Sequence, residues 1–214
     1  MRKNKLVFLF ILKSIVIFSI LALPFGFFDT AYAKFYSGIS KICFKKFDRT
    51  GFAVFSITKP ATNMHIELGN QLQANSSGMV RTATSDVNIR YRGYIPTIFV
   101  LSLILASPVS RKRKLYSILF GIFLITVFVM IKQWIHIVYM CHQQNWISLY
   151  SFSPGTQKTF KFLYLDFANY NGSSIIFSIV IWILVTFKRR DLENFKLMPE
   201  EVNMNGKMKS VLMK

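Results

Sequence analysis

The sequence predicts a mainly α-helical integral membrane protein, with about four transmembrane helices and a small antiparallel β insert outside the cytoplasm. Two observations predict this fold class. The chain of 214 residues is 52% hydrophobic and contains 22 Phe, yet its formal net charge is +18. The apolar and basic residues are also separated along the chain, as in membrane helices joined by basic loops. Such an apolar chain does not fit a basic nucleic-acid-binding domain.

Four segments of the chain are almost free of charge. A helix needs about 20 residues to cross the hydrocarbon core of a bilayer. The third segment reaches that length by extending through Trp134 and Ile135, and the fourth by starting near Phe167. We expect each segment to be a membrane helix, and the four segments are residues 6–28, 94–109, 115–131 and 173–187.

Clusters of basic residues predict the orientation of these helices. The clusters stand before the first segment, between the second and third, and after the fourth, at residues 2–5, 111–114 and 188–190. An even number of crossings puts all three on one side, which the positive-inside rule makes cytoplasmic. We therefore expect a multi-pass protein of the cytoplasmic membrane, with residues 188–214 as a cytoplasmic tail. The topology determinants, which would contact lipid headgroups rather than nucleic acid, are Arg111, Lys112, Arg113 and Lys114.

The first segment has two interpretations. A basic start, an apolar stretch and the sequence "AYA" before Lys34 are typical of a secretory signal peptide. The same residues, 1–28, also suit a retained first transmembrane helix. In both cases the chain that follows emerges outside the cytoplasm.

Residues 29–93 are predicted to form the extracytoplasmic β-rich insert. The stretch 51–58, "GFAVFSIT", is rich in β-branched and aromatic residues, and "MHIEL" at 64–68 alternates apolar with polar residues. These two stretches predict a hairpin, and the alternation in 80–91 predicts a further strand. So small a sheet buries little apolar surface and needs cover from the membrane, from a partner or from the loop 141–166. We expect the insert to contact another envelope protein. The basic residues that would favour an acidic partner are Arg81, Arg90 and Arg92.

The region 94–187 is expected to hold three membrane helices, and its outer loop, residues 141–166, is rich in aromatic residues. Aromatic rings with polar edges are typical of the headgroup level of a bilayer. Lys132 and His136 fall on one helical face four residues apart, near the outer end of the third segment. A lysine at this depth can extend its ammonium group toward the headgroups, which favours a structural role.

Candidate chemical groups are few. The motifs CxxC, HExxH and GxSxG and a glycine-rich phosphate loop are absent from the sequence, so we expect no metal and no cofactor. His65 and Glu67 share a strand face but have no third ligand. Cys43 and Cys141 would both lie in an oxidising compartment, where a disulfide between them is an open alternative. The candidates for a catalytic role are Cys141, His142, His136 and Arg90.

The layout from "RGYIPTIFVLSLILASPVSRKRKLYSILFGIFLITVFVMIKQWIHI" to "IIFSIVIWILVTF" resembles the C-terminal part of exosortase and archaeosortase membrane proteins. The resemblance implies a Cys before the first of these helices, an Arg near the end of the next and a His before the last. This chain has residues 92–94, 132–133 and 166–169 at those places, and none supplies the required residue. The resemblance therefore implies a non-catalytic relative or an accessory protein.

These observations lead to one functional hypothesis and one alternative. The hypothesis is a non-catalytic, multi-pass membrane subunit of a bacterial envelope, export or sorting assembly. The alternative is a membrane-embedded cysteine transpeptidase or protease of the exosortase type. A nucleophilic Cys needs a base within hydrogen-bond reach, and the sequence does not identify one for Cys141.

Overall fold

The computed structural model of the protein describes residues 2–23, 26–47, 49–58, 62–144, 147, 149–150 and 152–187. It is mainly helical, with one four-stranded antiparallel sheet. The α-helices are α1 (Arg2–Ala22), α2 (Gly26–Phe44), α3 (Ile95–Ala106), α4 (Arg111–Gln143), α5 (Pro154–Phe162) and α6 (Asn171–Thr186). The π-helical turns η1 (Arg90–Tyr94) and η2 (Leu163–Ala168) precede α3 and α6. The strands are β1 (Lys46–Phe47), β2 (Gly51–Thr58), β3 (Asn63–Ala74) and β4 (Val80–Asn88).

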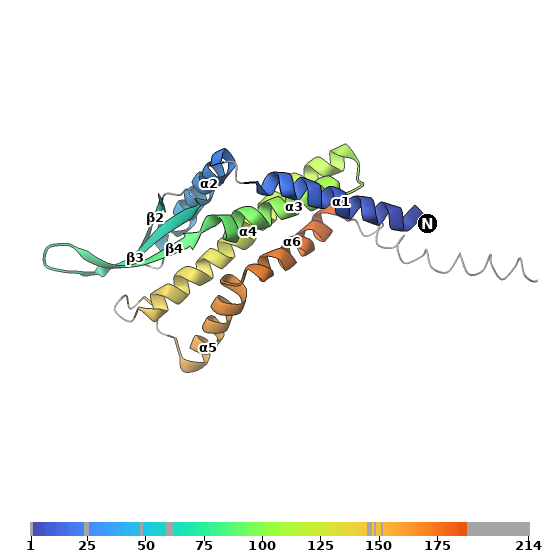
Figure 1. Cartoon of the computed structure of the whole chain (residues 1–214). Helices are drawn as coiled ribbons and strands as arrows, with labels where there is room; N and C mark the ends of the chain where they lie inside the picture. Colours follow the sequence, from blue (N-terminus) through green and yellow to red (C-terminus); the bar gives the residue numbers. More distant parts are fainter. Residues whose placement is uncertain are drawn as a thin grey trace, which may run out of the picture.

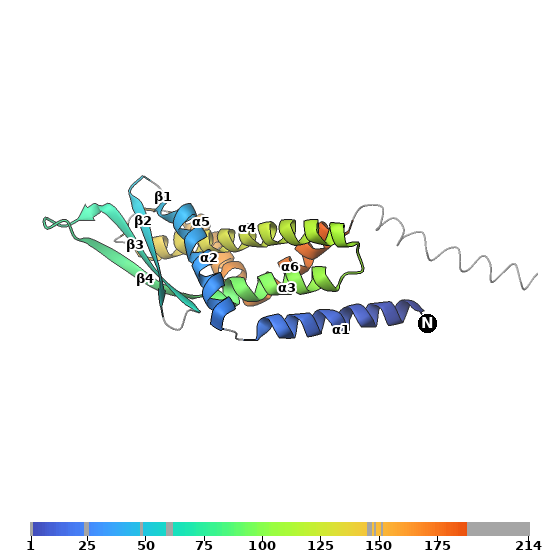
Figure 2. The same ribbon diagram turned by 90° about the horizontal axis from the view of Figure 1, so that it is seen from above.

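The molecule is elongated, and its two ends differ (Figures 1 and 2). The sheet, α2 and the C-terminal part of α4 lie at one end. The start of α1, the α3–α4 connection and the end of α6 lie together at the other end (Figures 1 and 2). Helix α1 packs along α3 and α6 through ring contacts, Phe18 with Phe99 at 5.7 Å and Phe10 with Trp182 at 5.3 Å between centroids.

One helix, α4, is long and apolar enough to cross a membrane by itself. Two bent pairs of helices also qualify by length and composition if each pair is taken as one span, α1 with α2 and the segment Pro154–Ala168 with α6. Helix α3 has only 12 residues, about 18 Å at 1.5 Å per residue. Among the described residues there is thus one candidate span, or up to three, and the expected number of about four crossings stays a prediction.

The predicted hairpins are present in the sheet. Strand β3 pairs antiparallel with β2 on one side and with β4 on the other. Alternate residues of the strands, including Phe55, Ile66, Leu68 and Val87, are buried and belong to the hydrophobic core. The alternation of apolar and polar residues in the sequence therefore marks the buried face of the sheet.

Two parts of the expected outer region are helical instead. Residues 26–44, which overlap the predicted β-rich insert, form α2, and its Ala33 and Tyr36 are buried in the same core as the sheet. The strand pattern at 80–91 ends at Asn88, because η1 continues directly into α3. Much of the predicted loop 141–166 is also helical, since α4 runs to Gln143 and α5 follows from Pro154. The expected cytoplasmic tail, 188–214, lies outside the described residues.

Candidate functional site

Polar side chains gather where η1, α4 and the start of α6 meet. We call this group the cationic cluster; its members are Arg92, Lys132, Gln133, His136 and Asn169. Helical spacing in α4 brings three of them together, because Lys132 and Gln133 are four and three residues before His136. These three side chains are almost fully buried, at 1%, 0% and 3% exposure for Lys132, Gln133 and His136. The α4 side of the cluster is therefore in the protein interior, whereas Arg92 is half-buried and Asn169 is exposed.

Lys132 connects α4 to the beginning of α6. Its Nζ donates to the Oγ of Ser174 at 2.7 Å, to the Oγ of Ser173 at 3.2 Å and to the carbonyl of Tyr170 at 3.3 Å. An ammonium group has three protons, so these neutral acceptors satisfy all of its donors. None of them compensates its charge. The sequence-based expectation that this lysine extends to the headgroups is therefore wrong for its side chain, which is turned inward.

Arg92 enters the cluster from η1 and has weaker contacts. One of its terminal nitrogens, Nη2, lies 3.3 Å from Oδ1 of Asn169 and 3.4 Å from Nδ1 of His136. Its other terminal nitrogen, Nη1, is buried and has no hydrogen-bond partner. Gln133 also has an unused buried donor. Its Oε1 accepts from Tyr36 at 2.8 Å, but its buried Nε2 has no hydrogen-bond partner. Two buried donors of the cluster are thus unused.

The same contacts define the tautomer of His136. A guanidinium can only donate, so Nδ1 of the ring must accept from Arg92 and the proton of the neutral ring lies on Nε2. Ser85 of β4 approaches that Nε2 to 3.1 Å. Activation of a serine requires the opposite arrangement, in which the nitrogen accepts the hydroxyl proton. In this geometry the Ser85–His136 pair is therefore not an activated nucleophile.

The charge of the cluster is positive and uncompensated. The cluster contains two cations, the Arg92 guanidinium and the Lys132 ammonium. In the part of the chain that the structure describes, neither forms an ion pair with Asp or Glu. Helix α6 adds to the positive potential through its dipole, and its N-cap residue Tyr170 makes no side-chain hydrogen bond to the helix start.

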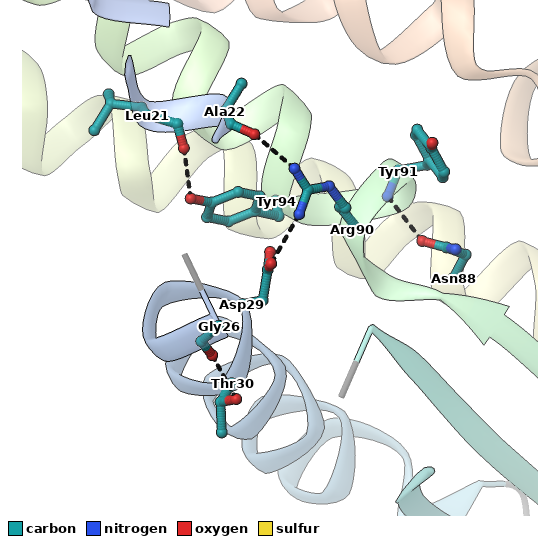
Figure 3. Close-up of polar contacts among 9 residues, drawn as sticks. All are labelled: Leu21, Ala22, Gly26, Asp29, Thr30, Asn88, Arg90, Tyr91 and Tyr94. Atoms are coloured by element: carbon teal, nitrogen blue, oxygen red, sulfur yellow. Dashed lines mark hydrogen bonds and ion pairs between the residues drawn. The ribbon is translucent and has the colours of Figure 1, made fainter. Parts of the chain in front are cut away.

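Arg90, two residues before Arg92, has a different place and a different role (Figure 3). Its guanidinium forms an ion pair with Asp29 of α2 at 2.8 Å and donates to the carbonyl of Ala22 at 2.6 Å. Tyr94 donates to the neighbouring carbonyl of Leu21 at 2.7 Å. The last carbonyls of α1 have no partner within the helix, so both side chains cap that helix (Figure 3).

The other catalytic candidates do not converge with Arg90. Cys141 is buried in the hydrophobic core at 1% exposure, and Cys43 is exposed, so the two thiols are free and no disulfide joins them. His142 packs against the ring of Phe152, with 4.9 Å between centroids, and lines a polar cavity of about 520 Å³ near Gln157 and Lys161. The predicted catalytic set of Cys141, His142, His136 and Arg90 is thus dispersed over four places.

The remaining predicted residues lie as follows. Of the expected partner contacts, Arg90 and Arg92 contact other groups of this chain, and the side chain of Arg81 in β4 is exposed. Lys114 donates to the carbonyl of Leu105 at 2.7 Å and closes the α3–α4 turn. Lys112 and Arg113 line a groove of about 850 Å³ between the start of α4 and the end of α6, and Arg111 is the first residue of α4.

The pair His65 and Glu67 does not make a metal site. Nδ1 of His65 contacts Asp86 at 2.8 Å, whereas its Nε2 faces Glu67 at 3.7 Å. The two carboxylates thus lie at opposite ring nitrogens and do not surround one point. Among the described residues, no group of three or more His, Cys, Asp or Glu residues could hold a metal ion.

Sequence reasoning identified Lys132 and His136 as neighbours on α4 but did not connect them with Arg92 or Asn169. One signal was available in the resemblance, which assigns importance to residues 92–94, 132–133 and 166–169. Side chains from all three places belong to the cationic cluster. Comparisons of the chain with protein-family models, with curated proteins and with solved structures find no match.

Proposed function

We propose that the chain is a multi-pass protein of the bacterial cytoplasmic membrane and a non-catalytic binding subunit of an envelope, export or sorting assembly. The observation that carries this proposal is the cationic cluster, in which a buried lysine, a half-buried arginine and unused donors surround a histidine whose Nδ1 faces the Arg92 guanidinium. Such a site is suited to binding a group rather than to transforming it.

The two unlike ends of the molecule support the membrane orientation. The basic run 111–114 lies at the end that also holds the start of α1 and the end of α6 (Figure 1). The sheet lies at the opposite end. The positive-inside rule would place the basic end in the cytoplasm and the sheet and the cationic cluster outside.

The first helix is retained in this proposal. The "AYA" sequence, a potential cleavage site, lies within α2, and its Ala33 is fully buried. A peptidase needs an accessible segment, and the C-terminal end of α1 is also held by Arg90 and Tyr94 (Figure 3). We therefore assign residues 1–28 to a membrane anchor rather than to a cleaved signal peptide.

Thiol labelling in intact cells tests this topology. Both Ser76, in the β3–β4 turn, and Ser110, before α4, are exposed. In a Cys43→Ser background, a Ser76→Cys chain should react with an impermeant thiol reagent, whereas a Ser110→Cys chain should react only after the cells are opened. Buried Cys141 should contribute little labelling. The reverse pattern would exclude the proposed orientation.

One observation favours the alternative, an enzyme of the exosortase type. The three places at which that family has its catalytic residues are together in this chain, and Ser85 contacts His136. If the Ser85 hydroxyl were a nucleophile, Ser85→Ala would abolish complementation of a deletion strain at normal protein level. In our proposal Ser85→Ala and Cys141→Ser both complement, while Arg92→Gln does not.

A further inference from the structure

We propose that the cationic cluster binds the phosphate group of a lipid headgroup, with Arg92 as the residue that contacts it. This inference deepens the proposed function and rests on its membrane orientation.

The first argument is the cost of the uncompensated charge. Lys132 is 1% exposed, and its three hydrogen bonds go to neutral oxygens. Arg92 is half-buried and likewise has only neutral partners in the described part of the chain. Removing a cation from water costs several kcal/mol unless an anion compensates it. An anion between Arg92 and the start of α6 would supply that compensation.

The second argument is that donors are available where the anion would lie. The two contacts of Arg92, at 3.3 and 3.4 Å, are long for a charge-assisted hydrogen bond, and its Nη1 is unused. Gln133 is 0% exposed and its Nε2 is also unused. Backbone N–H groups at the uncapped start of α6, near Asn169, add further donors. A phosphate group has enough acceptor sites for the Arg92 guanidinium, the Gln133 amide and the backbone N–H groups of α6.

The third argument is depth. From Lys114 to Lys132 the helix α4 advances 18 residues, about 27 Å at 1.5 Å per residue. The hydrocarbon core of a bilayer is about 30 Å thick. With the basic run at one headgroup layer, the cluster therefore reaches the opposite headgroup layer, where lipid phosphate is the abundant oxyanion.

The surroundings of the cluster suit a lipid that approaches from the bilayer. Asn169 and Tyr170, before the start of α6, are exposed, whereas Lys132 and Gln133 of α4 are buried. Just beyond, Ile176 of α6 is 61% exposed and offers an apolar surface to an acyl chain. The phosphate and an acyl chain of one lipid would thus contact neighbouring turns at the start of α6.

The test uses the full chain purified in a neutral detergent and follows its thermal unfolding. Dioctanoyl phosphatidylglycerol is the probe. Dioctanoylglycerol is the control for binding through the acyl chains, and inorganic phosphate is the control for binding of a free anion. The phospholipid should raise the unfolding temperature by several degrees, with little effect from either control. Arg92→Gln should weaken this binding roughly tenfold or more. Arg81→Gln, the same change at an exposed position of β4, should leave it unchanged.

Asn169→Asp provides a second variant at an exposed position, where misfolding is not expected. It puts a carboxylate 3.3 Å from the Arg92 guanidinium and so fills the site from within the chain. The lipid-free protein should become more stable, and the response to phospholipid should disappear. An unchanged lipid response in Asn169→Asp or Arg92→Gln would overturn the proposal.

The controls exclude the other ligands. An equal rise in unfolding temperature with dioctanoylglycerol would mean that the protein recognises only the acyl chains. An equal rise with inorganic phosphate would mean that the ligand is a free anion. Either result contradicts the lipid headgroup. Lipid binding in detergent does not depend on the orientation of the protein in a membrane. A negative result in this binding test is therefore distinguishable from a negative result for the topology, which thiol labelling measures.

Discussion

At position 93 only a hydrogen atom fits beside the ring of Tyr32. A Cβ at Gly93 would lie 2.6 Å from the Tyr32 hydroxyl oxygen, a distance that real Cβ atoms essentially never show, and 3.0 Å from Cε1, which is tighter than most Cβ contacts. The ring cannot move away freely, because its hydroxyl group also contacts Oγ1 of Thr97 at 3.2 Å. This close approach places η1 against α2 and so helps to position Arg92, the residue that precedes Gly93 in the chain.

We therefore expect Gly93→Ala to reduce the free energy of unfolding by about 1–3 kcal/mol, because overpacking forces neighbouring groups to shift. Gly38→Ala, within α2, is the matched control. A Cβ there meets nothing within 4 Å, and alanine favours a helix over glycine by about 0.5–1 kcal/mol. Chemical unfolding in detergent micelles measures both changes, and equal effects of the two substitutions would contradict the argument.

At the scale of the element, a single arginine holds three helices together. The side chains of Arg90 and Asp29 are only 19% and 11% exposed, so their ion pair is largely shielded from water. The same guanidinium caps α1 at Ala22, so α1, α2 and η1 meet at this group (Figure 3). One oxygen of Asp29, Oδ1, is buried without a partner, which makes the carboxylate dependent on Arg90.

Removal of the arginine should leave an uncompensated buried carboxylate. We expect Arg90→Met to destabilise the protein by about 3 kcal/mol. The double variant with Asp29→Asn should be less destabilised than Arg90→Met alone, because the stranded charge is then absent. A double-mutant cycle on unfolding free energies tests this coupling. Strictly additive effects of the two substitutions would show that the Arg90–Asp29 ion pair does not stabilise the contact between α1, α2 and η1.

At the scale of the whole molecule, the sheet and the helices share one hydrophobic core. Phe55, Ile66 and Leu68 of the sheet belong to the same buried cluster as Tyr36 of α2 and Ile137 of α4. The β-rich insert is thus covered by helices of its own chain. The cover that we expected from a partner protein is at least partly internal.

This shared core predicts that residues 29–93, expressed alone, do not form a stable domain. A segment of this size buries too little apolar surface to offset its loss of conformational entropy, and here it also loses the cover of α4. Circular dichroism should show a shallow, non-cooperative thermal transition for the segment, in contrast to the full chain in detergent. A steep cooperative transition would identify the insert as an independent domain.

The sequence by itself determined the features that depend on neighbouring residues. The β-branched and aromatic residues of 51–58 and the alternation of apolar and polar residues in 64–68 predicted the hairpin that the structure contains, because side chains of a strand point alternately to its two faces. Long apolar runs likewise predicted α4 and α6 as helices. Residues 26–44 have neither pattern clearly, and their helix, α2, was missed.

Only the tertiary structure decided which polar residues act together. Arg92 lies 44 residues from His136 and 77 from Asn169 along the chain, and no local pattern relates them. The tertiary structure also separated Arg90 from Arg92, which the sequence analysis had grouped as partner contacts. Their place in η1 directs Arg90 toward α1 and α2, and Arg92 toward α4. Local patterns follow from adjacent residues, whereas a binding site is formed by the packing of distant segments.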